Sequence, residues 1–161
     1  MVLFSAWLYV AWPLLRPDRV VYGFDTYAWW APTFETSSRS LRSGKLPLWS
    51  TEMFGGVPFL GRIGSAAIYP LHLPLMWFDA TRALQVSVAI HLLLMTLGFW
   101  ALVRFGFRLG GFATLVVPVA VLGCGFVATR SLAIDQIIPL AITPWILLFV
   151  ERTIATNSFR S

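Results

Sequence analysis

The sequence predicts an all-α membrane protein, a multi-spanning bundle of about four transmembrane helices whose long first extracytoplasmic loop contains short helices. Hydrophobic residues make up 58% of the chain and charged residues only 12%, whereas a soluble domain has about 25% charged residues. Four apolar segments alternate with charged or proline-rich links. The 161 residues therefore contain more apolar surface than one soluble core of this size can hide, and we expect a single membrane domain over 1–161.

The first apolar segment covers residues 1–15 and ends at Arg16 and Pro17. Charge and proline together terminate a membrane helix. A full span needs about 20 residues, so this segment is consistent with a helix clipped at its start. No Lys or Arg precedes the apolar run, and no small-residue cleavage site follows it, which disfavours a signal peptide. We expect a first transmembrane helix here.

Residues 16–81 form the predicted outer loop, which contains most of the acidic residues and is punctuated by Pro and Gly. Within it, residues 33–43 are predicted to form a short amphipathic helix, with Phe34 and Leu41 on one side. Residues 65–78 are apolar but too short and too rich in proline to span. A re-entrant or interfacial segment is the expected structure there.

Three further spans are predicted at 83–103, 111–129 and 136–150. The second of these carries Pro118 in its middle, which a membrane helix tolerates where neighbours satisfy the freed carbonyl. The link 104–110 has a charge of +2, whereas the link 130–135 is neutral. The positive-inside rule places 104–110 and both termini in the cytoplasm and the long loop outside. Six basic residues in the loop argue the other way, but loops beyond about 60 residues report orientation weakly.

Asp25 is the strongest candidate for a catalytic residue. It lies a few residues beyond the first span, in the aromatic sequence GFDTYAWWAP. A carboxylate desolvated near a membrane surface can act as a general base, or it can bind a divalent cation. A solvated loop carboxylate or a helix N-cap is the structural alternative.

Four basic residues of the loop are candidates for binding a lipid phosphate, because arginine suits bidentate phosphate contacts. They are Arg39, Arg42, Lys45 and Arg62. Simple attraction to anionic headgroups is the alternative. Residues 41–61 also contain Trp49 and Phe54, which are either a stacking platform for a sugar or anchors in a structural loop. Their glycines do not follow a phosphate-loop spacing, and we assign the net charge of +5 to membrane surfaces rather than to nucleic acid.

The remaining polar residues in apolar surroundings give weaker predictions. His91 falls inside a span, where it indicates either a polar interior or a neutral histidine hydrogen-bonded to a neighbouring helix. His72 lies near the interface, and two histidines this far apart make no metal-ligand pattern. Arg130 and Asp135 bound a short link, either as flanking charges or facing the same pocket as Asp25. The single cysteine, Cys124, is expected to be a small buried residue, so no metal ligand set is predicted.

Several motifs, in order, resemble the YfhO-type family of bacterial membrane proteins over nearly the whole chain. They are GFD at 23–25, RSGKLPLWS at 42–50, FGGVPFLG at 54–61, AIYPLHLP at 67–74, GCGFVATR at 123–130 and PLAITPWILLFVER at 139–152. Family members are several times longer than this chain, so the resemblance is to their amino-terminal part. They also often carry a histidine after the arginine that follows the third span, where this chain reads RSLAIDQ.

The resemblance implies a glycosyltransferase-like protein of the GT-C type in the bacterial cell membrane. Such enzymes transfer a sugar from a polyprenyl-phosphate carrier to an acceptor on the outer side, here a cell-envelope polymer such as lipoteichoic acid. Their catalytic acidic residue lies in the first outer loop, and Asp25 is the matching position. Whether a divalent cation takes part stays open. The alternatives are a non-catalytic scaffold or lipid-handling subunit and, less well supported, a small transporter.

Overall fold

The computed structural model describes residues 1–20, 23, 25–52, 55–62, 65–130 and 133–156, and it is mostly helical. Contacts divide the chain into two compact units. Unit 1 consists of Met1–Arg16 and Val88–Ser161, and unit 2 consists of Pro17–Ser87. The boundary lies within one long helix, and each unit is described by itself.

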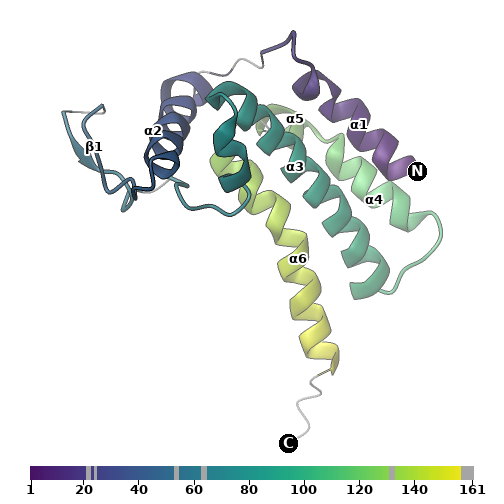
Figure 1. Cartoon of the computed structure of the whole chain (residues 1–161). Helices are drawn as coiled ribbons and strands as arrows, with labels where there is room; N and C mark the ends of the chain where they lie inside the picture. The colour runs from purple at the N-terminus through teal and green to yellow at the C-terminus, as the bar shows by residue number, and fades with distance from the viewer. Residues whose placement is uncertain (21–22, 24, 53–54, 63–64, 131–132, 157–161) are drawn as a thin grey trace, which may run out of the picture. The chain divides into compact units, whose positions relative to one another are not determined.

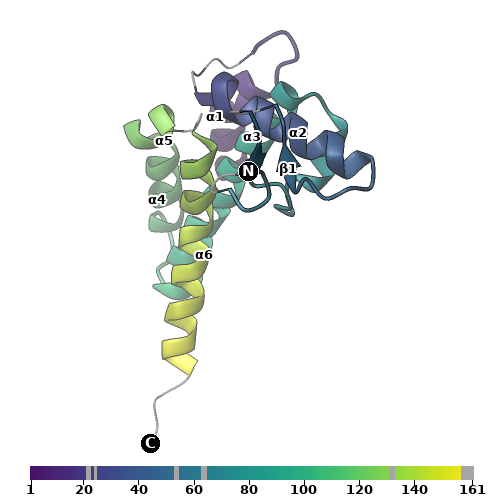
Figure 2. The ribbon, with the colours of Figure 1, turned by 90° about the vertical axis from the view of Figure 1, so that its left-hand side faces the viewer.

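Unit 1 is built from apolar helices (Figures 1 and 2). They are α1 (Val2–Leu15), the part of α3 (Ala80–Ala101) from Val88 onward, η3 (Leu102–Gly106), α4 (Ala113–Leu122), α5 (Gly125–Arg130) and α6 (Ile134–Thr156). Figure 1 shows α1 beside α4. The indole N–H of Trp7 in α1 donates a 2.9 Å hydrogen bond to the Ala89 carbonyl of α3.

Helices α3 and α6 pack closely and run in the same direction. The Trp145 indole N–H donates to the Leu94 carbonyl at 3.0 Å, and further along both helices Ala101 and Leu102 pack against Leu148. Gly98 permits the close approach, because a Cβ added there would lie 2.7 Å from both Pro144 Cγ and Trp145 Nε1. Small residues serve this purpose between membrane helices. The carboxyl ends of η3 and α6 consequently lie on the same side of unit 1.

The predicted third span, 111–129, is two helices in the structure. Pro118 stays inside α4, and the break falls instead at Gly123, where α4 ends before α5 starts at Gly125. Glycine costs about 1 kcal/mol in a helix relative to alanine, and two glycines flank Cys124. The break therefore coincides with this pair of glycines and not with the proline.

Two helical stretches are long and apolar enough to cross a membrane, namely Ala80–Gly106 with 27 residues and Ile134–Thr156 with 23. They include the predicted spans 83–103 and 136–150. Helices α1 and α4 are apolar but shorter. Only 22% of the apolar window of α6 is buried, whereas the core helix of a soluble protein is mostly buried. Much of the apolar surface of α6 is therefore exposed in this structure.

Unit 2 contains short helices and a small hairpin. Its elements are η1 (Thr26–Trp30), α2 (Ala31–Arg42), β1 (Trp49–Ser50), β2 (Val57–Pro58), η2 (Leu73–Trp77) and the start of α3. Helix α2 corresponds to the short helix predicted at 33–43. The predicted re-entrant segment 65–78 consists of turns and η2, with no helix of spanning length.

The hairpin was not predicted from the sequence. Its two strands pair antiparallel, with Trp49 opposite Pro58. Gly55 and Gly56 have φ angles of +75° and +130°, which allow the turn, and the Trp49 ring lies directly over Gly56. Phe59, just after the second strand, is fully buried and belongs to the core of unit 2.

Two hydrogen bonds fix the start of α3 in unit 2. Asp79 Oδ1 accepts the Arg82 backbone N–H at 2.9 Å, which is the geometry of an N-cap. The Gln85 side-chain amide donates to the Arg19 carbonyl at 3.0 Å. The segment that follows α1 in the sequence is thereby tied to the first turns of α3.

Candidate functional site

Asp25 lies exposed at the start of a continuous helical stretch. It directly precedes η1, and its φ and ψ of −64° and −32° are already helical. In the part of the chain that the structure describes, its side chain makes no capping hydrogen bond. The N-cap alternative considered from the sequence is therefore not the geometry seen at this residue.

Arg62 lies against the same helical stretch, one to two turns after Asp25. Its guanidinium carbon is 3.9 Å from the centroid of the Trp29 ring, and its Nη2 donates to Thr33 Oγ1 at 3.1 Å. Burial lowers the pKa of the Arg62 guanidinium from its ordinary value, but an arginine remains charged at neutral pH. An aromatic ring and a fixed positive charge thus follow the exposed carboxylate of Asp25 along the helix.

Arg39 and Arg42 lie near the other end of α2 and contact carboxylates. Arg39 pairs with Glu35 at 3.7 Å and also with Glu52, and Arg42 pairs with Glu35 at 3.8 Å. Thr36 Oγ1 donates to Glu52 Oε2 at 3.0 Å. These contacts join α2 to the residues after β1, and they neutralise much of the positive charge predicted to bind a phosphate.

Three of the four predicted phosphate-binding residues lie on α2 or just beyond the turn after it, and Arg62 reaches α2 from the segment after β2. Arg62 contacts Thr33, whereas Arg42 is nine residues further on, about 13 Å along the helix axis. Lys45 is exposed beyond the turn at Gly44, and its backbone N–H donates to the Ser40 carbonyl at 3.0 Å. Arg39 and Arg42 lie together around Glu35. Arg62 lies apart from them, against Trp29 and Thr33, which follow Asp25 in the same helical stretch.

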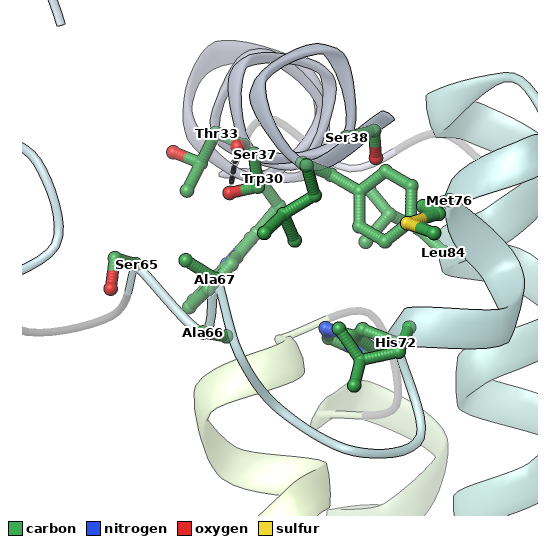
Figure 3. Close-up of a pocket in the computed structure, with 13 residues that line it drawn as sticks. Trp30, Thr33, Ser37, Ser38, Ser65, Ala66, Ala67, His72, Met76 and Leu84 are labelled. Atoms are coloured by element: carbon green, nitrogen blue, oxygen red, sulfur yellow. Dashed lines mark hydrogen bonds between the residues drawn. The ribbon is translucent and has the colours of Figure 1, made fainter. Parts of the chain in front are cut away.

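A small cavity lies between α2 and the residues leading into η2 (Figure 3). Its lining includes Trp30, Ser38, Ala67 and His72, and its volume is about 20 Å³. That volume holds about one water molecule. The cavity is therefore too small for a sugar ring, and we do not assign it to a substrate.

His72 is a buried polar residue whose environment the sequence did not reveal. His72 Nε2 and Ser87 Oγ lie 2.9 Å apart in a hydrogen bond. The rings of Tyr69 and Phe34 meet the imidazole edge-on, at centroid distances of 4.9 Å and 5.6 Å, and burial raises the pKa of the Tyr69 hydroxyl. The alternation of His with apolar residues in YPLHLP is the only sequence signal for this burial.

Of the proposed sugar-stacking pair, Trp49 lies in β1 and Phe54 lies outside the described residues. Four further residues considered from the sequence lie in unit 1. His91 is fully buried in α3, and Cys124 is partly buried between α4 and α5. Arg130 and Asp135 are exposed, and because they belong to a different unit from Asp25, a shared pocket stays a prediction. Among the described residues, no three His, Cys, Asp or Glu side chains gather as a metal site would require.

Comparison of the chain with protein-family models, with curated proteins and with solved structures found no match.

Proposed function

We propose that this chain forms part of a multi-spanning bacterial membrane protein that transfers a sugar from a polyprenyl-phosphate carrier to a cell-envelope acceptor. The resemblance to YfhO-type and GT-C-like proteins motivates the proposal. The observation that carries it is the exposed carboxylate of Asp25 at the start of a helix whose next turn presents Trp29, with Arg62 stacked on it. These are the groups that a sugar phosphate needs: a base, an aromatic face and a cation.

The parallel packing of α3 and α6 supports the proposed membrane topology. If both helices cross the bilayer in the same direction, the chain between them has to return to the side on which α3 began. Residues 107–133 make that return, and α4 and α5 are its helices. With α1 as a further crossing, the chain would make the four proposed spans, and the positive-inside rule would put Asp25 on the outer side.

In this mechanism Asp25 removes the proton from the acceptor hydroxyl, the acceptor oxygen bonds to the anomeric carbon of the sugar, and the bond between that carbon and the lipid phosphate breaks. Arg62 stabilises the negative charge that develops on the departing lipid phosphate, as fixed cations do in phosphoryl chemistry. Arg39, Arg42 and Lys45 have the secondary role of attracting anionic lipid to the loop, because Glu35 and Glu52 already pair with the two arginines.

The test is sugar transfer from a polyprenyl-phosphate donor in membranes that contain Asp25→Asn at normal expression. General-base catalysis contributes about 10²–10⁴-fold to a rate, so transfer should fall at least about 100-fold. Asp79→Asn is the matched control, because Asp79 is also an exposed aspartate and asparagine retains its N-cap hydrogen bond; it should leave the rate unchanged. Full transfer by Asp25→Asn would rule out the catalytic role.

A non-catalytic scaffold or lipid-handling subunit is the second candidate. The observations that favour it are the pairing of Arg39 and Arg42 with Glu35 and Glu52 and the small volume of the cavity in unit 2. This alternative predicts no transfer by wild-type membranes above those that lack the protein, while membrane association persists. Donor-dependent transfer that Asp25→Asn abolishes would decide against it.

A further inference from the structure

Unit 1 contains a charged pocket where the carboxyl ends of η3 and α6 meet. Arg104 and Arg108 line it on one side, and Glu151, Arg152 and Thr156 line it on the other. Its volume is about 310 Å³, within the size range of small-molecule sites. No residue proposed above to act in sugar transfer belongs to this pocket.

The floor of the pocket is apolar although its walls are charged. Gly106 is buried, and a Cβ added there would lie 3.0 Å from Leu102 Cδ1 and 3.5 Å from Leu148 Cδ1. Leu102 and Leu148 belong to the packed core of α3, η3 and α6. The pocket thus begins where the apolar packing of these helices ends, which is the boundary that a lipid headgroup occupies.

Arg108 adopts a backbone conformation that arginine rarely takes. Its φ is +56°, in the left-handed region that costs about 1–2 kcal/mol for residues with a Cβ. Two hydrogen bonds hold this turn, from the Phe107 N–H to the Leu102 carbonyl at 2.9 Å and from the Leu109 N–H to the Val103 carbonyl at 3.0 Å. Glycine would adopt this conformation freely, but the residue at this position is an arginine. The turn places its side chain at the pocket.

The charge of the pocket matches a singly charged anion. Three arginines and one glutamate leave a side-chain charge of +2. Each helix carboxyl end contributes about −0.5, so roughly one positive charge remains. The positive charge of the three arginines therefore exceeds the combined negative charge of Glu151 and the two helix carboxyl ends. The Arg152 guanidinium also lies 5.9 Å from the centroid of the Phe105 ring, which restricts where that charge sits.

We propose that this pocket binds the phosphodiester group of an anionic lipid headgroup. Arg104, Arg108 and Arg152 contact the phosphate, and the acyl chains follow the exposed apolar surface of α6 that includes Ile146 and Phe149. The apolar floor and this neighbouring surface favour a lipid over free phosphate as the source of the anion. The proposal requires α3 and α6 to cross the membrane, but it is independent of sugar transfer.

The experiment titrates phosphatidylglycerol, phosphatidylcholine or inorganic phosphate into the full chain purified in neutral detergent. Binding is followed by native mass spectrometry and by the melting temperature. We expect phosphatidylglycerol to bind preferentially, and Arg104→Gln or Arg152→Gln to weaken it by about fivefold each, as expected for about 1 kcal/mol per basic residue. Arg130→Gln is the matched control with the same loss of charge, and it should bind normally.

Glu151→Gln gives a result of opposite sign, which a damaged fold would not imitate. Removing this carboxylate should strengthen phosphatidylglycerol binding by about fivefold. An equal loss of binding in Arg130→Gln and Arg152→Gln would overturn the proposal, because it would indicate general surface charge. Stabilisation by inorganic phosphate equal to that by phosphatidylglycerol would overturn the assignment to a lipid. Unchanged binding in both Arg104→Gln and Glu151→Gln would exclude this pocket.

Discussion

Units 1 and 2 differ in the contacts that join their elements. In unit 1, α3 and α6 meet through Gly98 and a packed apolar cluster, and tryptophan N–H groups in α1 and α6 donate to backbone carbonyls of α3. In unit 2, α2 is joined to neighbouring segments by ion pairs and by hydrogen bonds between side chains, such as Thr36 to Glu52 and Arg62 to Thr33.

If unit 1 lies in lipid and unit 2 in water, as proposed, the difference follows from these two solvents. In lipid there is no hydrophobic drive between helices, so close packing and backbone acceptors hold them. In water, exposed ion pairs contribute little, about 0–1 kcal/mol each, but they fix which segment lies against which. The comparison predicts that unit 1 is sensitive to added volume, whereas unit 2 is sensitive to individual polar groups and to salt.

The largest effect is expected for Gly98→Ala in unit 1. The new Cβ would lie 2.7 Å from atoms of Pro144 and Trp145, so α3 and α6 have to separate. Overpacking of this kind costs about 1–3 kcal/mol, measured as the free energy of unfolding in mixed micelles. Gly125→Ala is the control, since a Cβ there meets nothing within 4 Å. Equal stability of the two variants would contradict the packing described for α3 and α6.

A smaller effect is expected for Asp79→Ala in unit 2. The variant removes the acceptor of the Arg82 N–H, and loss of an N-cap costs about 1 kcal/mol. Asp79→Asn should retain nearly full stability, because asparagine caps about as well. A thermal melt of the three proteins checks this order. If Asp79→Asn were as unstable as Asp79→Ala, the charge of Asp79 rather than its hydrogen bond would be what matters.

The smallest effect is expected for Glu52→Gln. It weakens the pair with Arg39, while the new amide oxygen can still accept from Thr36. Both side chains are more than half exposed, so solvent screens the pair and the loss should be about 0.5 kcal/mol or less. The difference from wild type should vanish at high salt. Its persistence in high salt would indicate that the geometry, not the charge, holds α2 to the hairpin.

Apolar length predicted the helices of unit 1 well. The stretches around 83–103 and 136–150 form helices of spanning length, and the helix at 33–43 was also found. The break at Gly123 was not predicted, because Pro118 is the stronger breaker by residue type alone. The hairpin was missed as well, since two-residue strands carry no period that a sequence pattern can reveal.

The candidate site was predicted as residue types but not as an arrangement. Asp25 and Arg62 are 37 positions apart, and no spacing rule connects them. Their relation depends on the fold that puts Arg62 on the Trp29 ring. The pairing of Arg39 with Glu35 could have been anticipated from their spacing of four residues. The pairing of Glu52 with Arg39 and the formation of the charged pocket in unit 1 both depend on contacts between segments that are distant in the sequence. A sequence pattern does not show such contacts.

The close packing of Gly98 in α3 against α6 also has a consequence for biosynthesis. Its partners, Pro144 and Trp145, lie 46 and 47 positions later in the chain. At a translation rate of about 5–20 residues per second, the ribosome needs roughly 2–10 s to make that stretch. During this interval α3 has already been synthesised while its partner is missing. If both helices cross the membrane, as proposed, α3 has to remain without its packing partner until α6 arrives, and slower translation between them would lengthen that wait.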